Sequence, residues 1–229
     1  MAAVAMALRG FCRFCLQRGY VHRDLTPAIP SLVRHRLSRI PHGISEEQTR
    51  KALCGIQREA PLGKRDYAIM QMLYTYGIRA RQICLLRLDD IQWSAAQIRF
   101  HALKGGKTVI VPVTDEVGDS LLDYLQGGRA PSSRPEVFLT VRPPGHPMTS
   151  TAISTLVSRR LQSADVPLSP HGAGVFRHGF ACRMLAAGHS LKSIADMLGH
   201  RDIQTTSIYA KVDFRMLASV ALEWPKEEP

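Results

Sequence analysis

The last third of the sequence carries residue types that can hold a phosphate and attack it. An Arg177-His178 pair is followed by the letters LGH, which end at His200, and by TTSIY, which ends at Tyr209, nine residues after that histidine. Guanidinium groups bind phosphates at two points, a geometry that an ammonium group cannot copy. A tyrosine oxygen can form a covalent bond to phosphorus. These residues could therefore perform phosphoryl transfer without a metal ion.

Two upstream segments hold further cationic candidates. The letters YGIR end at Arg79 and precede LLRLDDI, within a stretch of helical pattern. Lys104 and Lys107 flank a Gly-Gly pair between two β-type runs, and a lysine on such a turn could protonate a leaving oxygen. Lys107 is as available for this role as Lys104. The two lysines could also simply protect the edge of a hairpin.

Together these segments resemble the tyrosine recombinases, also called phage-type integrases. The family's C-terminal signature is matched by the Arg-His pair, LGH and TTSIY. Its first catalytic arginine, and the helix that carries it, are matched by YGIR and LLRLDDI. The turn that bears its catalytic lysine resembles KGGK. All of them occur in the family's order. The resemblance covers about residues 43 to 225.

The resemblance implies a site-specific recombinase or integrase that cleaves and rejoins strands of double-stranded DNA through a 3′-phosphotyrosyl intermediate. It assigns the nucleophile to Tyr209 and the binding of the scissile phosphate to Arg79 and Arg177. Lys104 would protonate the leaving 5′ oxygen, and His200 would hydrogen-bond a non-bridging oxygen. No cofactor and no metal ion are implied.

Each assignment has a simpler alternative. A tyrosine on a short amphipathic helix is usually a packing residue, and only the context of His200 and TTSIY reverses this for Tyr209. An arginine at a helix end is usually solvated. Histidines at positions 171, 178, 189 and 200 lack the spacing of a zinc motif. We therefore expect no metal site, and we expect His178 to be a structural histidine.

The sequence departs from the family at two positions. Gly174 stands where a histidine usually lies, and His171 could replace that histidine only if the loop were rearranged. Gln82 replaces an acidic residue, so it keeps a hydrogen-bonding group but loses the charge that would orient Arg79. We expect reduced activity. The alternative is a catalytically impaired relic that occupies DNA sites without strand exchange, and a relaxing topoisomerase of the same chemistry is disfavoured by the resemblance.

The elements that must position these residues are expected to form a mainly α fold with a small antiparallel β-sheet, in the α+β class. A capping box at Ser45 predicts one helix start, and Gly77 predicts a helix end. Two glycines between the last two β runs predict a tight hairpin turn. The expected helices are 6–18, one from Ser45, 65–76, 80–88, 115–126, 149–163, 177–187, 191–198 and 206–211, and the expected β runs are 91–93, 97–103 and 108–113.

The chain is expected to divide near residue 43. Residues 1–42 would be a remnant of the family's N-terminal core-binding helical domain plus a linker, too short to close a clamp around the duplex. Residues 43–229 would be the catalytic domain with a C-terminal tail helix. Phe214, Leu217, Ala218 and Leu222 lie on one helical stripe of that tail. The stripe could cover its own core, but in the family it docks on a neighbouring protomer, so we expect a homo-oligomer on DNA.

Charge and composition fit a nucleic-acid partner. The 30 basic and 19 acidic residues give a net charge of +11, and residues 1–40 hold seven basic side chains against one acidic. The positive electrostatic potential of such a chain favours binding of a polyanion, although the charge could also serve only to keep the protein in solution. No apolar run approaches the roughly 18 residues that span a bilayer, so a transmembrane protein is excluded. Five cysteines in apolar contexts indicate reduced thiols and a cytoplasmic protein.

Overall fold

The computed structural model describes residues 2–30, 43–103, 107–167 and 172–199, together with Thr206 and Tyr209. The chain divides into two compact units, Met1–Arg39 and Ile40–Pro229. No helix among the described residues is long and apolar enough to cross a membrane. The functional roles expected for the two parts stay predictions.

The first unit contains α1 (Ala2–Gln17) and a short 3-10 helix at Thr26–Ala28. Arg9 ties the helix to the segment after it, because its Nη2 donates to the carbonyl oxygens of Ile29 at 2.9 Å and Pro30 at 2.8 Å. Several large apolar side chains of this small unit, Phe11 among them, remain exposed. The unit therefore has little core of its own.

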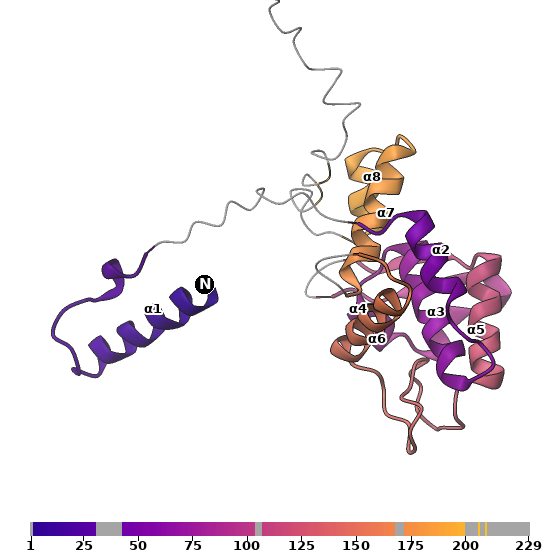
Figure 1. Ribbon diagram of the computed structural model, residues 1–229, viewed down its shortest axis with the longest axis horizontal. Coiled ribbons are helices and arrows are strands. Elements are labelled where there is room, and N and C mark those ends of the chain that lie inside the picture. Colours follow the sequence, from indigo (N-terminus) through magenta and orange to yellow (C-terminus); the bar gives the residue numbers. More distant parts are fainter. Residues whose placement is uncertain are drawn as a thin grey trace, which may run out of the picture. The chain divides into compact units, whose positions relative to one another are not determined.

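The second unit is built around α3 (Pro61–Tyr76), which lies among the other helices of the unit (Figure 1). Most residues of α3 are buried. Four helices pack against it, namely α2 (Glu46–Cys54), α5 (Asp115–Gly127), α6 (Ser150–Ser163) and α7 (Gly174–Ala186). In the described part of this unit, α4 (Ala80–Leu85) also packs against α6, and α8 (Leu191–Met197) packs against α7. The core lies between α3 and these surrounding helices.

Helix ends follow local chemistry where the sequence offers it. Ser45 accepts a hydrogen bond from the Gln48 backbone at 3.1 Å, and the Gln48 side chain accepts one from the Ser45 backbone at 3.0 Å, which confirms the predicted capping box. Gly77 ends α3 with a left-handed φ of 60°, also as predicted. Pro61 begins α3 four residues before the expected start at position 65, because proline suits a first helical position.

A small antiparallel sheet of three strands, in the order β1-β2-β3, completes the expected mainly α fold, which is confirmed. The strands are β1 (Ile91–Gln92), β2 (Gln97–Phe100) and β3 (Val109–Pro112). Ile98 pairs with Ile91 on one side and Val111 on the other, and all three are buried. Tyr76 donates to the Pro112 carbonyl at 2.7 Å and so joins the end of α3 to β3.

Three further expected helix boundaries were wrong. The expected helix 6–18 begins at Ala2. The expected helix 80–88 ends at Leu85, because Leu86 is extended and its carbonyl accepts from the Val137 backbone at 2.9 Å. The expected helix 177–187 begins at Gly174, so Arg177 lies inside its first turn. The expected helix 206–211 and the hairpin turn lie outside the described residues, except for Thr206 and Tyr209.

A buried ionic group fixes α6 against α3. The carboxylate of Asp66 accepts from Arg65 Nη2 at 2.9 Å and from Arg160 Nη2 at 2.7 Å, and Asp66 is only 5% exposed. Buried charges require such partners, because an unpaired charge in the core is strongly destabilising. The group therefore constrains how the two helices meet.

Candidate active site

Arg79 lies at the junction between α3 and α4. It follows the left-handed Gly77 by two residues and caps the start of α4. The side-chain oxygen of Gln82 accepts from the Arg79 backbone N–H at 3.1 Å, and its amide donates to the His101 carbonyl at 3.5 Å. Gln82 therefore fixes the main chain of Arg79 and links it to the segment that follows β2.

Arg177 reaches across to the same junction from α7. Its Nη1 donates to the Gly77 carbonyl at 3.0 Å, and its Nη2 donates to the Leu198 carbonyl at 2.7 Å. Arg79 Nη1 lies 3.5 Å from the same Leu198 oxygen. The two arginines expected to bind phosphate are thus brought together, although they come from helices far apart in sequence.

Glycine at position 77 makes this approach possible. A Cβ there would lie 2.6 Å from the Phe180 ring, so any side chain would push α7 away from the end of α3. Its positive φ also favours glycine. The small residue therefore serves both the helix end and the placement of Arg177.

Burial and mutual repulsion shape the charge of the two guanidinium groups. Burial, followed by the positive charge of Arg79, lowers the pKa of Arg177 to about 9, with Tyr209 opposing the change. Burial likewise lowers the pKa of Arg79. Arg177 therefore stays charged at pH 7 while partly desolvated beside a second cation. Such a pair favours an anion that bridges both groups.

Tyr209 lies in a small cluster between α7 and α8. Its side chain is 2% exposed and packs with Phe180, Ile194 and Leu198. Its hydroxyl lies 2.8 Å from Nδ1 of His178, and the two ring centroids are 5.7 Å apart. Burial raises the pKa of Tyr209 to about 12, against the opposing charges of the arginines. The hydroxyl is therefore protonated at neutral pH.

His178, which was expected to be a structural histidine, lies directly against Tyr209. It is half-buried and contacts the hydroxyl of the candidate nucleophile. Burial, with a smaller effect of Arg177, lowers the pKa of His178, so the imidazole is neutral at pH 7. The signal available in the sequence was the position of His178 directly after Arg177.

Gly174 occupies the first position of α7, one helical turn before His178. It is exposed, a Cβ placed there would meet no atom within 4 Å, and its φ is outside the left-handed region. Residues four apart on a helix share a face. A side chain at 174 would therefore fit and would lie on the same face as His178.

Three other candidates, Lys104, His171 and His200, lie outside the described residues. The second hairpin lysine, Lys107, is described and exposed, with its Nζ 3.5 Å from an Asp196 carboxylate oxygen on α8. Its carbonyl oxygen lies 3.4 Å from where a Cβ on Gly199 would be. The hairpin base therefore lies beside the end of α8. In the described part of the chain, no group of three potential ligands could hold a metal ion.

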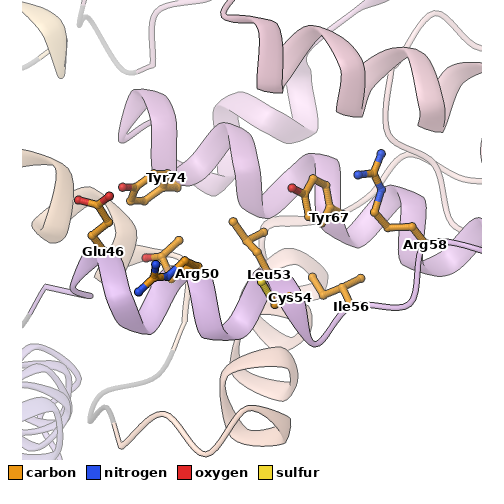
Figure 2. A pocket seen from close by; sticks show the side chains of 9 residues that line it. Glu46, Arg50, Leu53, Cys54, Ile56, Arg58, Tyr67 and Tyr74 are labelled. Carbon is orange, nitrogen blue, oxygen red and sulfur yellow. The ribbon is translucent and has the colours of Figure 1, made fainter.

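A pocket of about 360 Å³ lies elsewhere, along α2 and α3 (Figure 2). Arg58 stacks over the Tyr67 ring at 4.5 Å on its border. The residues lining it do not include the arginines, Tyr209 or His178. The pocket is lined by Glu46, Thr49, Arg50, Leu53, Cys54, Ile56, Arg58, Tyr67 and Tyr74.

Comparison with known proteins gives a consistent result. Residues 44–216 match the family profile described as Phage integrase family. A Sinorhizobium fredii protein, y4rA, which carries the name integrase/recombinase, is 37% identical over 225 residues, covering 98% of this chain and 54% of that protein. The tyrosine recombinase XerD of Ralstonia nicotianae is 37% identical over 180 residues, covering 76% of this chain and 57% of that protein. The chain therefore spans about half the length of these curated relatives.

Solved structures share the fold. XerA recombinase matches with a TM-score of 0.67 at 21% identity, over 89% of this chain and 69% of that chain. XerH recombinase, in a post-cleavage complex with a palindromic difH substrate, matches with a TM-score of 0.72 at 20% identity, over 90% of this chain and 60% of that chain. At such identities the likeness concerns the fold alone.

Proposed function

The chain belongs to the phage integrase family, and we propose that it cleaves and rejoins DNA at specific sites through a covalent 3′-phosphotyrosyl intermediate. The observation that carries this proposal is the meeting of Arg79 and Arg177 at the Leu198 carbonyl. Leu198 also packs in the cluster that holds Tyr209. A phosphate bound by the arginines would therefore lie close to the nucleophile.

The arginines provide the electrostatic part of the reaction. Attack on phosphorus adds negative charge to the phosphoryl oxygens, and preorganised cations stabilise that charge. Each guanidinium carries five N–H donors, and among the described residues Arg177 directs two of its nitrogens to backbone carbonyls. These contacts hold the group in place while other donors face a phosphate. No metal ion or cofactor is required by this scheme.

The remaining roles rest on the resemblance. Lys104 is proposed to protonate the leaving 5′ oxygen, and His200 to hydrogen-bond a non-bridging oxygen of the phosphate. The position of Lys107 supports this arrangement, because it brings the base of the hairpin next to α8. Lys107 itself remains the alternative donor.

Double-stranded DNA is the proposed partner, and the net charge of +11 supports it. Residues 1–42 are proposed to derive from the helical domain that grips DNA in the family, and residues 43–229 to form the catalytic domain. Residues 213–229 are proposed to dock on a neighbouring protomer, giving a homo-oligomer on DNA in the cytoplasm. That tail lies outside the described residues.

One observation favours a second function. Gly174 provides no side chain at the position where the family usually has a histidine, so the chain could be a relic that binds recombination sites without cutting them. Covalent trapping separates the two functions. A duplex site selected by the protein from a random-sequence pool would be rebuilt with a nick beside the scissile phosphate. Wild type should form an adduct that survives denaturing gels, and Tyr209→Phe should bind equally without one. Binding without any adduct would establish the relic.

A further inference from the structure

The contact between His178 and Tyr209 has a geometry suited to proton transfer. Nδ1 of His178 lies 2.8 Å from the tyrosine hydroxyl, within the range of a direct hydrogen bond. The two ring planes are tilted by 55° and their centroids lie 5.7 Å apart, so the rings also pack against each other. Both side chains are at least half-buried, and this shields the contact from exchange with water.

We propose that His178, with its proton on Nε2, accepts the hydroxyl proton of Tyr209 as the tyrosine attacks the scissile phosphate. This inference rests on the proposed function and deepens it, because it assigns the proton acceptor to a residue that the family resemblance left without a catalytic role. Gly174 cannot act as an acceptor, since it has no side chain. His178 lies one turn further along the same helical face.

The step balances without any co-reactant. The O–H bond of Tyr209 breaks, its electron pair forms the new bond to phosphorus, and the proton passes to Nδ1 of His178. The bond from phosphorus to the 5′ oxygen breaks, and that oxygen takes a proton from the general acid, proposed above to be Lys104. In religation the 5′ hydroxyl attacks and returns its proton to the general acid, which lost a proton during cleavage. The His178 imidazolium returns its proton to the departing phenolate oxygen.

The surroundings keep both partners in the protonation states that this step needs. Burial raises the pKa of Tyr209 to about 12, so the phenol cannot supply its own phenolate in useful amounts at pH 7. Burial and the nearby Arg177 lower the pKa of His178, so its acceptor form dominates there. Cys182 on α7 adds no charge at that pH, because burial raises the pKa of its thiol. Among the described residues, the charged groups that act on Tyr209 are Arg79 and Arg177.

The test compares the single-turnover rate of adduct formation for the full chain on the nicked substrate. His178→Asn places an amide near the position of Nδ1, so the hydrogen bond to Tyr209 can persist while proton acceptance is lost. We expect a rate about 10² to 10⁴ lower at pH 7, with unchanged DNA affinity. His189 is exposed and lies between α7 and α8, so it provides the matched control. His189→Asn should form the adduct at the wild-type rate.

The pH profile separates a proton acceptor from a packing residue. The wild-type rate should be level above the ordinary histidine pKa of about 6.5 and should fall below the lowered pKa of His178, where the imidazole is protonated. The rate of His178→Asn should instead rise about tenfold per pH unit from 7 to 9, because the scarce phenolate becomes the nucleophile. Parallel profiles for the two proteins would overturn the proposal.

A second variant guards against misfolding. Gly174→His restores an imidazole to the same face of α7. The double variant Gly174→His/His178→Asn should therefore form the adduct at least tenfold faster than His178→Asn alone. A rate for His178→Asn equal to wild type would overturn this inference and leave the proposed function standing. An absence of adduct from wild type would overturn both.

Discussion

Arg79 and Arg177 donate to one oxygen atom, the backbone carbonyl of Leu198, at 3.5 and 2.7 Å. The first arginine caps α4 and the second lies in the first turn of α7, so the site is formed only when both helices meet the end of α8. Because the two positively charged guanidinium groups lie close together and are partly buried, an anion bound between them would reduce their repulsion. This relationship is the structural basis of the proposed phosphate site.

Replacing either arginine with lysine should impair cleavage despite the retained charge. An ammonium group cannot contact both a carbonyl anchor and a phosphate as a guanidinium fork does. We expect Arg177→Lys and Arg79→Lys each to lower the rate of adduct formation about 10² to 10³, the usual loss for one transition-state donor. The exposed Arg159 on α6 gives the control, and Arg159→Lys should retain the wild-type rate. Wild-type rates in the first two variants would refute their roles.

DNA binding should depend steeply on salt. Each phosphate neutralised on duplex DNA releases counterions and contributes about −0.9 to the slope of log K against log salt. Arg177→Gln should therefore reduce the magnitude of the slope by about one unit, because one contact is lost. Fluorescence anisotropy on the selected duplex at several salt concentrations measures this. A slope near zero for wild type would remove DNA as the partner.

The buried carboxylate of Asp66 should matter for stability more than the charged pairs at the surface. Asp66→Asn leaves Arg65 and Arg160 without their anion, and breaking such a buried pair costs about 3 to 5 kcal/mol of unfolding free energy. Asp123→Asn is the matched control. It disrupts the more exposed contacts with Arg58 and Lys64 and should cost about 1 kcal/mol or less per ion pair. Urea titrations of the two variants should show this order, and equal losses would contradict it.

Gly174→His alone should change little. Because His178 already contacts the Tyr209 hydroxyl, a second imidazole on that face should raise the adduct rate by no more than about tenfold. The substitution fits sterically, so folding and DNA affinity should be unchanged. An increase of about 10² or more would mean that His178 does not serve as the acceptor. Conversion from no adduct to a measurable one would support the relic interpretation.

Local signals in the sequence were sufficient for several helix ends. The capping box at Ser45 and the glycine at 77 act through hydrogen bonds and backbone angles within a few residues, so their effects are visible in sequence. The start of α7 was missed because Gly172 and Gly174 suggest a loop. Tertiary packing outweighs that tendency there, since Val175 and Phe176 are buried and the Val175 carbonyl accepts from Ile44.

The site was only partly predictable. The resemblance selected Arg79, Arg177 and Tyr209. The group that joins the two arginines is a backbone carbonyl, and because every residue has one, the sequence does not identify it. Gln82 keeps a hydrogen-bonding group, as expected, but the sequence could not show that this group would accept from the main chain of Arg79. The His178 contact depends on where Tyr209 packs between α7 and α8, which is a property of the folded chain.

The central claim is that Tyr209 forms a covalent bond to the 3′ phosphate of the cut strand, and mass spectrometry of the trapped complex tests it most directly. The adduct on the nicked substrate would be digested with trypsin and nuclease, and the modified peptide would be sequenced. We predict a nucleotide linked through its 3′ phosphate to Tyr209, absent from the Tyr209→Phe protein. A link to another residue, a link through a 5′ phosphate, or an adduct that persists in Tyr209→Phe would contradict the account.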